Sequence, residues 1–375
     1  MPLTATAHDQ MNKNAYAEML VRVQPPILAC LRALEDVQQT ILFQHIASAQ
    51  RSLAVSCGAS LEDALSELAA TTPPPPQAEL HLALRQALEF LVSAKQGFVA
   101  EANWANFTQA FLTSRNQQCR ALEILYRWRA ALALIAPYFR LAGSDEIPQP
   151  PTPTDRRVHP PVGLMHCPRT NVHHDYALYV PEHYDPTQQW PLIIALHGAY
   201  GSGQEYIWSW LRAAASRGFV VLAPSAHGPT WSILQPALDC QSILHMLDAV
   251  ASRYVLDGAR VYVSGLSDGG TFSYLLGFEY AARFAALAPI AGVLSPNTDA
   301  LLRARRGIEL PLHVIHGVHD AIFPVQTVRS TNQLLRTLGY QLTYTELPEW
   351  GHALTSGINE RVVLPWFEAL HRQPP

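Results

Sequence analysis

The sequence predicts an α/β fold with a doubly wound, mostly parallel sheet, preceded by a separate all-α domain. Apolar residues recur at helical spacing before about residue 148, whereas short apolar strands alternate with amphipathic helices after about residue 163. A proline-rich stretch, with prolines at 148, 150, 151 and 153, separates the helical pattern from the alternating pattern of strands and helices. We therefore expect an α-helical domain over residues 1–147, an extended linker over 148–162 and an α/β domain over 163–375.

The first of these domains reads as a helical bundle of modest size. Leucines follow one another at intervals of three or four residues, for example at Leu80, Leu84, Leu88 and Leu91. The run of four prolines at 73–76 would break any helix and predicts a short spacer between helical hairpins. We expect five or six helices between residues 12 and 142.

The α/β domain shows seven candidate strands, several of which are apolar along their whole length, as is typical of parallel strands buried on both faces. The expected strands are Tyr176–Val180, Leu192–His197, Val220–Ala223, Arg260–Ser264, Ala285–Ile290, Leu312–His316 and Leu342–Glu346. The expected helices are Glu205–Arg217, Leu238–Tyr254, Thr271–Ala282, Pro324–Leu338 and Asn359–Leu370.

Composition excludes several classes of function. The formal net charge is −4 and 15% of the residues are charged, so the chain has no basic excess with which to bind nucleic acid or an anionic membrane. The most apolar helical run is too short to cross a bilayer, so we expect no membrane span. The five cysteines form no CxxC pair, which favours buried free thiols over a zinc site or disulfides. No cofactor is expected.

The N-terminus has neither a basic segment nor an apolar core, so no secretory signal is predicted. Together with the cysteine pattern, this favours a cytoplasmic protein. Nearly all basic residues are arginine, and alanine is abundant, which is typical of a GC-rich bacterial genome.

The most informative motif is Gly-Leu-Ser-Asp-Gly at 265–269. It follows a predicted strand and precedes a predicted helix, which is the context of a sharp turn that exposes a serine hydroxyl. The flanking glycines suit that turn because a side chain at either position would clash with the backbone. Ser267 is therefore the candidate nucleophile. A free hydroxyl reacts weakly, so a base, an orienting carboxylate and an oxyanion site are also needed.

A glycine-rich loop at 195–203 follows another buried strand and fits the oxyanion site. The N–H of Asp268, directly after the nucleophile, would be one donor. Ala199, which follows His197-Gly198, is the best candidate for the second donor, and Tyr200 is the alternative.

Two further segments place a carboxylate and a histidine after strands. Asp320 follows the strand 312–316, and His352 follows the last strand, so the order Ser267, Asp320, His352 is that expected of a catalytic triad on such a sheet. His316 and His319 lie near Asp320 and open the alternative of a metal site. No HExxH motif accompanies them, so packing roles are expected instead.

These motifs resemble those of the α/β-hydrolase superfamily, within it the esterases related to polyhydroxybutyrate depolymerases, feruloyl esterases and the phospholipase/carboxylesterase group. The resemblance covers residues from about 176 to 372 and rests on the segments 196–198, 265–270, 317–320 and 351–352. It implies a serine ester hydrolase with Ser267 as nucleophile, His352 as base and acid, and Asp320 as the residue that orients His352. The helical region resembles no family that we can name.

The substrate and the role of the helical region stay open at this level. Aromatic residues in loops near the expected site, Tyr200, Trp231 and Trp350, are candidates for contacts to a small-molecule ester. A peptidase or amidase would carry the same triad, and a non-catalytic binding protein is a third reading. The helical region could cover the site as a lid, mediate homo-oligomer formation or serve as an appendage. Oligomer formation is favoured because a lid normally inserts within the hydrolase domain.

Overall fold

The computed structural model describes residues 5–100, 104–144, 160–304 and 309–371. The chain divides into two compact units, residues 1–142 and 143–375. The linker predicted over 148–162 lies, up to residue 159, outside the described residues.

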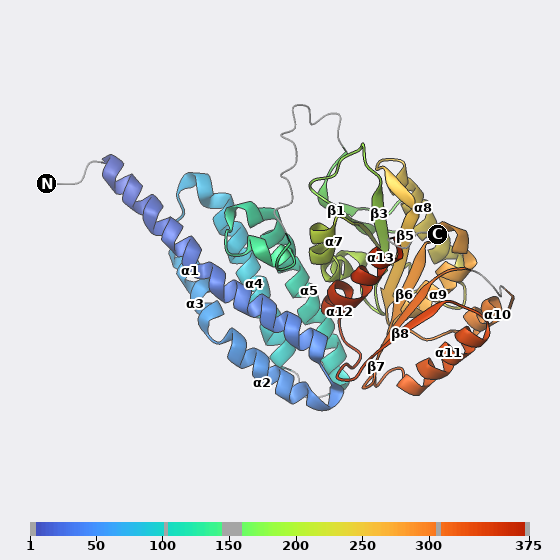
Figure 1. Ribbon diagram of the computed structural model, residues 1–375. Coiled ribbons are helices and arrows are strands. Elements are labelled where there is room, and N and C mark those ends of the chain that lie inside the picture. The colour runs from blue at the N-terminus through green and yellow to red at the C-terminus, as the bar shows by residue number, and fades with distance from the viewer. Residues whose placement is uncertain (1–4, 101–103, 145–159, 305–308, 372–375) are drawn as a thin grey trace. The chain divides into compact units, whose positions relative to one another are not determined.

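The first unit is built from helices throughout its described residues. They are α1 (Ala5–Thr40), α2 (Ile46–Cys57), α3 (Ser60–Ala70), α4 (Ala78–Ala100) and α5 (Trp104–Trp128), followed by short 3₁₀ turns. Helices α4 and α5 lie side by side (Figure 1). The leucines at helical spacing are buried, with Leu84 and Leu88 at most 1% exposed. The proline run at 73–76 separates α3 from α4, as predicted.

The second unit contains one eight-stranded sheet. Its strands are β1 (Gly163–Cys167), β2 (Tyr176–Val180), β3 (Trp190–Leu196), β4 (Val220–Pro224), β5 (Leu256–Leu266), β6 (Ala286–Ile290), β7 (Leu312–Gly317) and β8 (Leu342–Leu347). Their order in the sheet is β1-β2-β4-β3-β5-β6-β7-β8. The β1/β2 and β2/β4 pairs are antiparallel, and every other pair is parallel. This mostly parallel sheet, after an all-helical region, confirms the predicted α/β-hydrolase fold class.

Helices cover both faces of the sheet (Figure 1). They are α6 (Gly203–Tyr206), α7 (Leu211–Arg217), α8 (Ala237–Ala251), α9 (Asp268–Glu279), α10 (Pro296–Ala304), α11 (Val325–Thr337), α12 (Ser356–Ile358) and α13 (Leu364–His371). Because side chains alternate along a strand, Val261 and Val263 of β5 join the core that contains Phe272 of α9. Tyr262 lies between them and stacks on Phe367 of α13, with ring centroids 4.3 Å apart.

The strand β1 and the helix α10 were not predicted. Strand β1 is an edge strand paired with β2, and its burial is irregular. Gly163 is buried, and the other residues of the strand are partly or fully exposed. It therefore lacks the continuous apolar run by which the other strands were found. The helix predicted over 205–217 is divided into α6 and α7 by a 3₁₀ turn at Ile207–Ser209.

The order in which successive parallel strands are added to the sheet reverses at strand β3. Its neighbours are β4 on one side and β5 on the other, and the strands after β5 are added outward in the direction away from β4. In open α/β sheets the crevice beyond the carboxyl ends of the strands at such a point is where ligands bind. Both the glycine-rich loop after β3 and the serine motif after β5 lie at this edge.

Candidate active site

Ser267 connects β5 to α9 in a conformation that non-glycine residues seldom adopt. Its φ is 58° and its ψ is −119°, a backbone strain that costs on the order of 1–3 kcal/mol and clusters at functional sites. Two backbone hydrogen bonds hold the turn, from Ser267 N to the Ile290 carbonyl at 2.9 Å and from Thr271 N to the Ser267 carbonyl at 2.9 Å. The side chain of Ser267 is partly exposed. The strand, turn and helix predicted around the serine are therefore present.

The glycines that flank the serine are required by close backbone packing. A Cβ added at Gly265 would lie 2.4 Å from the carbonyl carbon of Gly269, and one added at Gly269 would lie 2.3 Å from the Leu196 carbonyl oxygen. These contacts press the start of α9 against the end of β3. They bring the glycine-rich loop and the serine turn together.

We expect Gly269→Ala to lower the free energy of unfolding by about 1–3 kcal/mol or more, because the contact is with backbone that cannot move aside. Urea unfolding of both proteins measures the difference. Gly258→Ala is the matched control, since a Cβ there meets nothing within 4 Å. Equal midpoints for Gly269→Ala and Gly258→Ala would contradict the packing described.

Backbone amides near Ser267 fit an oxyanion site. Gly198 lies beside the serine, since a Cβ added to it would be 3.4 Å from Ser267 Cβ. Asp268 is the first residue of α9, so its N–H is among the amides that a helix leaves without an internal partner. The Tyr200 N–H donates to the Pro229 carbonyl at 2.6 Å and is thereby occupied. Of the two candidates for the second donor, the geometry therefore favours Ala199.

Asp320 and His352 come together at the ends of β7 and β8. The Nδ1 atom of His352 lies 2.8 Å from Oδ2 of Asp320. The other oxygen, Oδ1, accepts the backbone N–H groups of Ile322 at 2.9 Å and Phe323 at 2.8 Å. Each carboxylate oxygen therefore has its own partners, and the carboxylate cannot rotate without losing them.

Backbone contacts join the two loops that carry this pair. The N–H of His319 donates to the Trp350 carbonyl at 3.1 Å, and that of Val318 donates to the Leu347 carbonyl at 3.0 Å. A Cβ at Gly317 would lie 2.2 Å from the Trp350 carbonyl oxygen, so only glycine allows this approach. The separation between the loops is thus set by backbone packing.

The pKa of Asp320 lies below its ordinary value. Burial alone would raise it, but the hydrogen bond and charge of His352 and the N–H of Phe323 outweigh burial. Because the folded-state pKa is lower than the unfolded one, ionised Asp320 stabilises the fold above about pH 4, and this contribution is lost as pH falls through the folded-state pKa. At neutral pH the group next to His352 is therefore a carboxylate.

The structure brings some predicted site residues together more closely than others. Asp320 and His352 are in direct contact, while no hydrogen bond between the Ser267 hydroxyl and His352 is formed among the described residues. Such bonds are often long in the absence of substrate and shorten in the reacting complex.

The histidines near Asp320 have packing positions. His316 is fully buried, its Nε2–H donates to the Phe323 carbonyl at 2.8 Å, and burial lowers its pKa. His319 is exposed. Within the described residues, no group of three or more His, Cys, Asp or Glu side chains could hold a metal ion.

The aromatic residues predicted to contact substrate differ in their surroundings. Tyr200 is 69% exposed on the loop beside Ser267. Trp231 is 1% exposed and stacks on Phe272, with ring centroids 5.1 Å apart. The structure therefore places Trp231 in the core, and its contact with substrate stays a prediction. Trp350 is also buried, at 8% exposed, and packs against Gly317.

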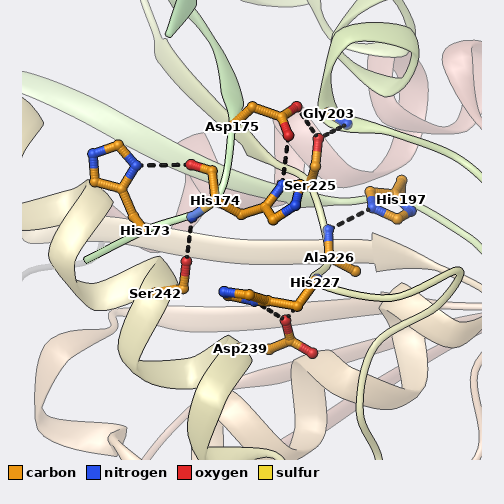
Figure 2. A network of polar contacts seen from close by, with 10 residues as sticks. All are labelled: His173, His174, Asp175, His197, Gly203, Ser225, Ala226, His227, Asp239 and Ser242. Carbon is orange, nitrogen blue, oxygen red and sulfur yellow. Dashed lines mark hydrogen bonds and ion pairs between the residues drawn. The ribbon is translucent and has the colours of Figure 1, made fainter. Parts of the chain in front are cut away.

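Several polar side chains that surround the glycine-rich loop were not predicted as part of the site. Thr230 donates from Oγ1 to the Asp268 carboxylate. Asp239 of α8 is 1% exposed and contacts His227. Figure 2 shows the contact of His227 with Asp239 together with the contacts of His197 and Ser225. These side chains come from the loops after β3 and β4 and from α8 and share no motif, so only the fold could reveal their contacts.

Comparison with known proteins agrees with this geometry. Residues 174–311 match the family described as Esterase PHB depolymerase. The chain is 34% identical over 158 residues to the bifunctional acetylxylan esterase/xylanase of Neocallimastix patriciarum, a match that covers 41% of this chain and 22% of the relative. It is 25% identical over 187 residues to a probable feruloyl esterase C of Aspergillus terreus, covering 47% of this chain and 66% of the relative.

Among solved structures, the acetyl xylan esterase from Aspergillus awamori is similar at 19% identity and a TM-score of 0.46, covering 55% of this chain and 99% of that one. The matches to the two curated relatives thus span from about a fifth to about two thirds of those proteins. Over residues 174–311 the chain is similar to the Esterase PHB depolymerase family, and it is a homologue of feruloyl and acetylxylan esterases, with a helical region before the α/β-hydrolase fold.

Proposed function

We propose that this protein is a serine carboxylesterase that hydrolyses acyl esters through Ser267, His352 and Asp320. The observation that carries the proposal is the strained turn at Ser267, placed at the same sheet edge as the bonded pair of Asp320 and His352. A protein without need of an exposed hydroxyl has no reason to maintain this strain. Homology to carboxylic ester hydrolases supports the same reaction.

In the proposed mechanism, His352 takes the proton of the Ser267 hydroxyl through Nε2 as the serine oxygen attacks the ester carbonyl. Asp320, bonded to Nδ1, keeps the ring in the required tautomer and stabilises the imidazolium. The amides of Ala199 and Asp268 stabilise the oxyanion of the tetrahedral intermediate. The intermediate then expels the alcohol, which receives the proton from His352, and leaves an acyl-serine. Water, deprotonated by His352, attacks the acyl-serine. The second intermediate then collapses, releasing the acid as protonated His352 returns the proton to the Ser267 oxygen.

The substrate is proposed to be an uncharged ester with a small or aromatic acyl group. The names of the relatives, feruloyl esterase and acetylxylan esterase, support this class. The exposed Tyr200 beside the site offers an aromatic face to such a group. Asp268 places a carboxylate next to the nucleophile, and its charge opposes the binding of an anionic acyl group.

The test is a fluorophosphonate probe together with a panel of p-nitrophenyl esters and peptide p-nitroanilides. We expect covalent labelling of the folded protein and hydrolysis of acetyl and feruloyl esters at rates well above those of the amides. A folded protein that neither labels nor hydrolyses any ester would remove the proposal. Faster cleavage of amides than of esters would replace it with a peptidase.

We propose that the helical unit mediates association of the chain with itself. The reason is its place before the α/β unit, since a lid normally inserts within the hydrolase domain. The expected result is a mass above the 41.5 kDa of one chain in light scattering, falling to that of a single chain when residues 1–142 are deleted. A full chain with the mass of one copy at all concentrations would contradict association.

The free cysteines support a reducing compartment for this enzyme, for which we propose the cytoplasm of a bacterium. Four of the five are buried, and none of them forms a disulfide.

A further inference from the structure

His197, the residue before Gly198, has both ring nitrogens in directed contacts. It is 2% exposed. Its Nε2 atom lies 3.1 Å from the backbone nitrogen of Ala226, and its Nδ1 atom lies 2.7 Å from the carbonyl oxygen of Gly198. Its own carbonyl accepts the indole N–H of Trp231 at 2.8 Å. These contacts hold the side chain and the main chain of the residue at once.

The contacts determine the protonation of the ring. Ala226 N–H can only donate, so Nε2 must accept and carries no proton. The Gly198 carbonyl can only accept, so Nδ1 carries the proton and donates it. Burial disfavours the charged ring and lowers the pKa of His197, which agrees with a neutral imidazole in this tautomer.

The bond from Nδ1 acts directly on the peptide that contains the oxyanion donor. The Gly198 carbonyl and the Ala199 N–H belong to one planar trans unit, so they point in opposite directions. Because Gly198 has no side chain to limit its torsions, something else must orient that unit. His197 does so from one end, and the N–H of Gly201, which also donates to the Gly198 carbonyl at 3.2 Å, assists.

The support beneath His197 is a loop, residues 225–232, that is itself tied at both ends. The carboxylate of Asp239 accepts the N–H of His227 at 3.0 Å through Oδ1 and the N–H of Ser232 at 2.8 Å through Oδ2. Ala226, directly before the first of these points, donates to the His197 ring, and Trp231, directly before the second, donates to the His197 carbonyl. Figure 2 shows Ala226 donating to His197 above the pair of His227 and Asp239.

The far end of the glycine-rich loop is tied to the same segment. The N–H of Gly203 donates to Ser225 Oγ at 3.1 Å, and that hydroxyl donates to Asp175 at 2.8 Å (Figure 2). A Cβ at Gly203 would lie 1.9 Å from the Ala223 carbonyl oxygen, so the backbones touch there. The loop is thus fixed before and after Ala199, and the peptide of Gly198 and Ala199 lies between the two anchors.

We propose that His197 is a positioning residue whose Nδ1–H, through the Gly198 carbonyl, aims the Ala199 amide at the oxyanion. The inference rests on the proposed function, because it concerns the transition state of that reaction. The two ring nitrogens have different roles. Nδ1 orients the peptide that carries the Ala199 amide, while Nε2 anchors the ring to the loop at 225–232.

Two substitutions separate the nitrogens. In His197→Asn the amide nitrogen takes the place of Nδ1 and can still donate to the Gly198 carbonyl, whereas in His197→Gln the amide oxygen takes the place of Nε2 and can still accept from Ala226. We expect His197→Gln to lower kcat for p-nitrophenyl acetate by about 100-fold with KM changed less than about threefold, as for loss of an oxyanion donor. His197→Asn is expected to keep kcat within about tenfold of wild type.

The controls are thermal unfolding of each variant and the matched substitution His313→Gln. His313 is a buried histidine of β7 whose Nε2 lies 2.8 Å from Thr345 Oγ1, away from the site. The kcat of His313→Gln should equal that of the wild-type protein. If His197→Gln does not fold, Trp231→Phe keeps the ring stack but removes the bond to the His197 carbonyl, and it should lower kcat by about tenfold.

A lower kcat in His197→Asn than in His197→Gln would overturn the proposal, because the ring would then act through Ala226 alone. Wild-type kcat in both variants, or in Trp231→Phe where that arm is used, would overturn it as well. Failure of the proposed function gives a different pattern, since the wild-type protein itself would neither take the fluorophosphonate label nor hydrolyse the ester.

Discussion

Replacing Ser267 by alanine is expected to lower kcat for ester hydrolysis on the order of 10⁶-fold, the loss that accompanies removal of a catalytic serine. Without the hydroxyl no acyl-serine forms, and the bonded pair of His352 and Asp320 has no nucleophile to activate. The remaining rate would come from the amides of Ala199 and Asp268 and from substrate binding. Steady-state rates on p-nitrophenyl acetate, with fluorophosphonate labelling of both proteins, measure the effect.

Ser264→Ala is the control for this substitution. Ser264 lies in β5, three residues before Ser267, is fully buried, and donates to the Ala288 carbonyl at 2.8 Å. It should label and turn over ester at the wild-type rate if it is folded. An active, labelled Ser267→Ala protein would show that another residue is the nucleophile.

Replacing Asp320 by asparagine is expected to lower kcat by about 10⁴-fold. The reason lies in how the two carboxylate oxygens are used. Oδ1 accepts two backbone N–H groups, from Ile322 and Phe323, so the amide oxygen of asparagine must take that place. The amide N–H₂ then faces His352, Nδ1 becomes an acceptor, and the ring proton moves to Nε2. That is the atom needed to take the serine proton.

Asp320→Asn should lose catalytic rate without losing the fold. The fold of Asp320→Asn should be kept near neutral pH, because both backbone bonds to the amide oxygen remain. The loss should fall on kcat, with little change in KM, in steady-state assays with p-nitrophenyl esters. Asp248→Asn is the control, since the Asp248 side chain is 61% exposed and pairs with Arg283 on the surface, where such pairs contribute little. An Asp320→Asn variant with wild-type kcat would exclude Asp320 as the orienting group.

The fold could be predicted from sequence where burial leaves a regular pattern. Strands β3 and β4 are buried throughout, so their apolar runs were visible, and the proline run at 73–76 marked the boundary of two helices. Strand β1 was not predicted, because an edge strand that is exposed on one side needs no continuous apolar run. The single helix predicted over 205–217 was wrong because helical periodicity does not reveal a 3₁₀ turn at Ile207–Ser209.

Within the site, residues near in sequence were easier to predict than residues brought together by folding. The glycines around Ser267 predict a tight turn from the local sequence alone. The structure shows the close backbone contacts that require these glycines. The position of Trp231 depends on Phe272 and on the His197 carbonyl, neither of which its neighbours in sequence suggest. The sequence therefore predicts a loop tryptophan that could contact substrate, and only the structure shows that its indole is buried.

The fold class and the order of the segments that carry Ser267, Asp320 and His352 could be predicted from sequence, because periodicity and turn chemistry depend on residues close together in the chain. Which amides have a hydrogen-bond partner depends on the folded chain. Tyr200 and Ala199 are adjacent and equivalent as sequence, yet Pro229, nearly thirty residues later, occupies the amide of Tyr200. Hydrogen-bond satisfaction is a property of the packed chain, since each buried donor takes whichever acceptor the fold brings to it. The contacts that join His197 to the Gly198 carbonyl and to Ala226, and His227 to Asp239, likewise arise only in the folded chain.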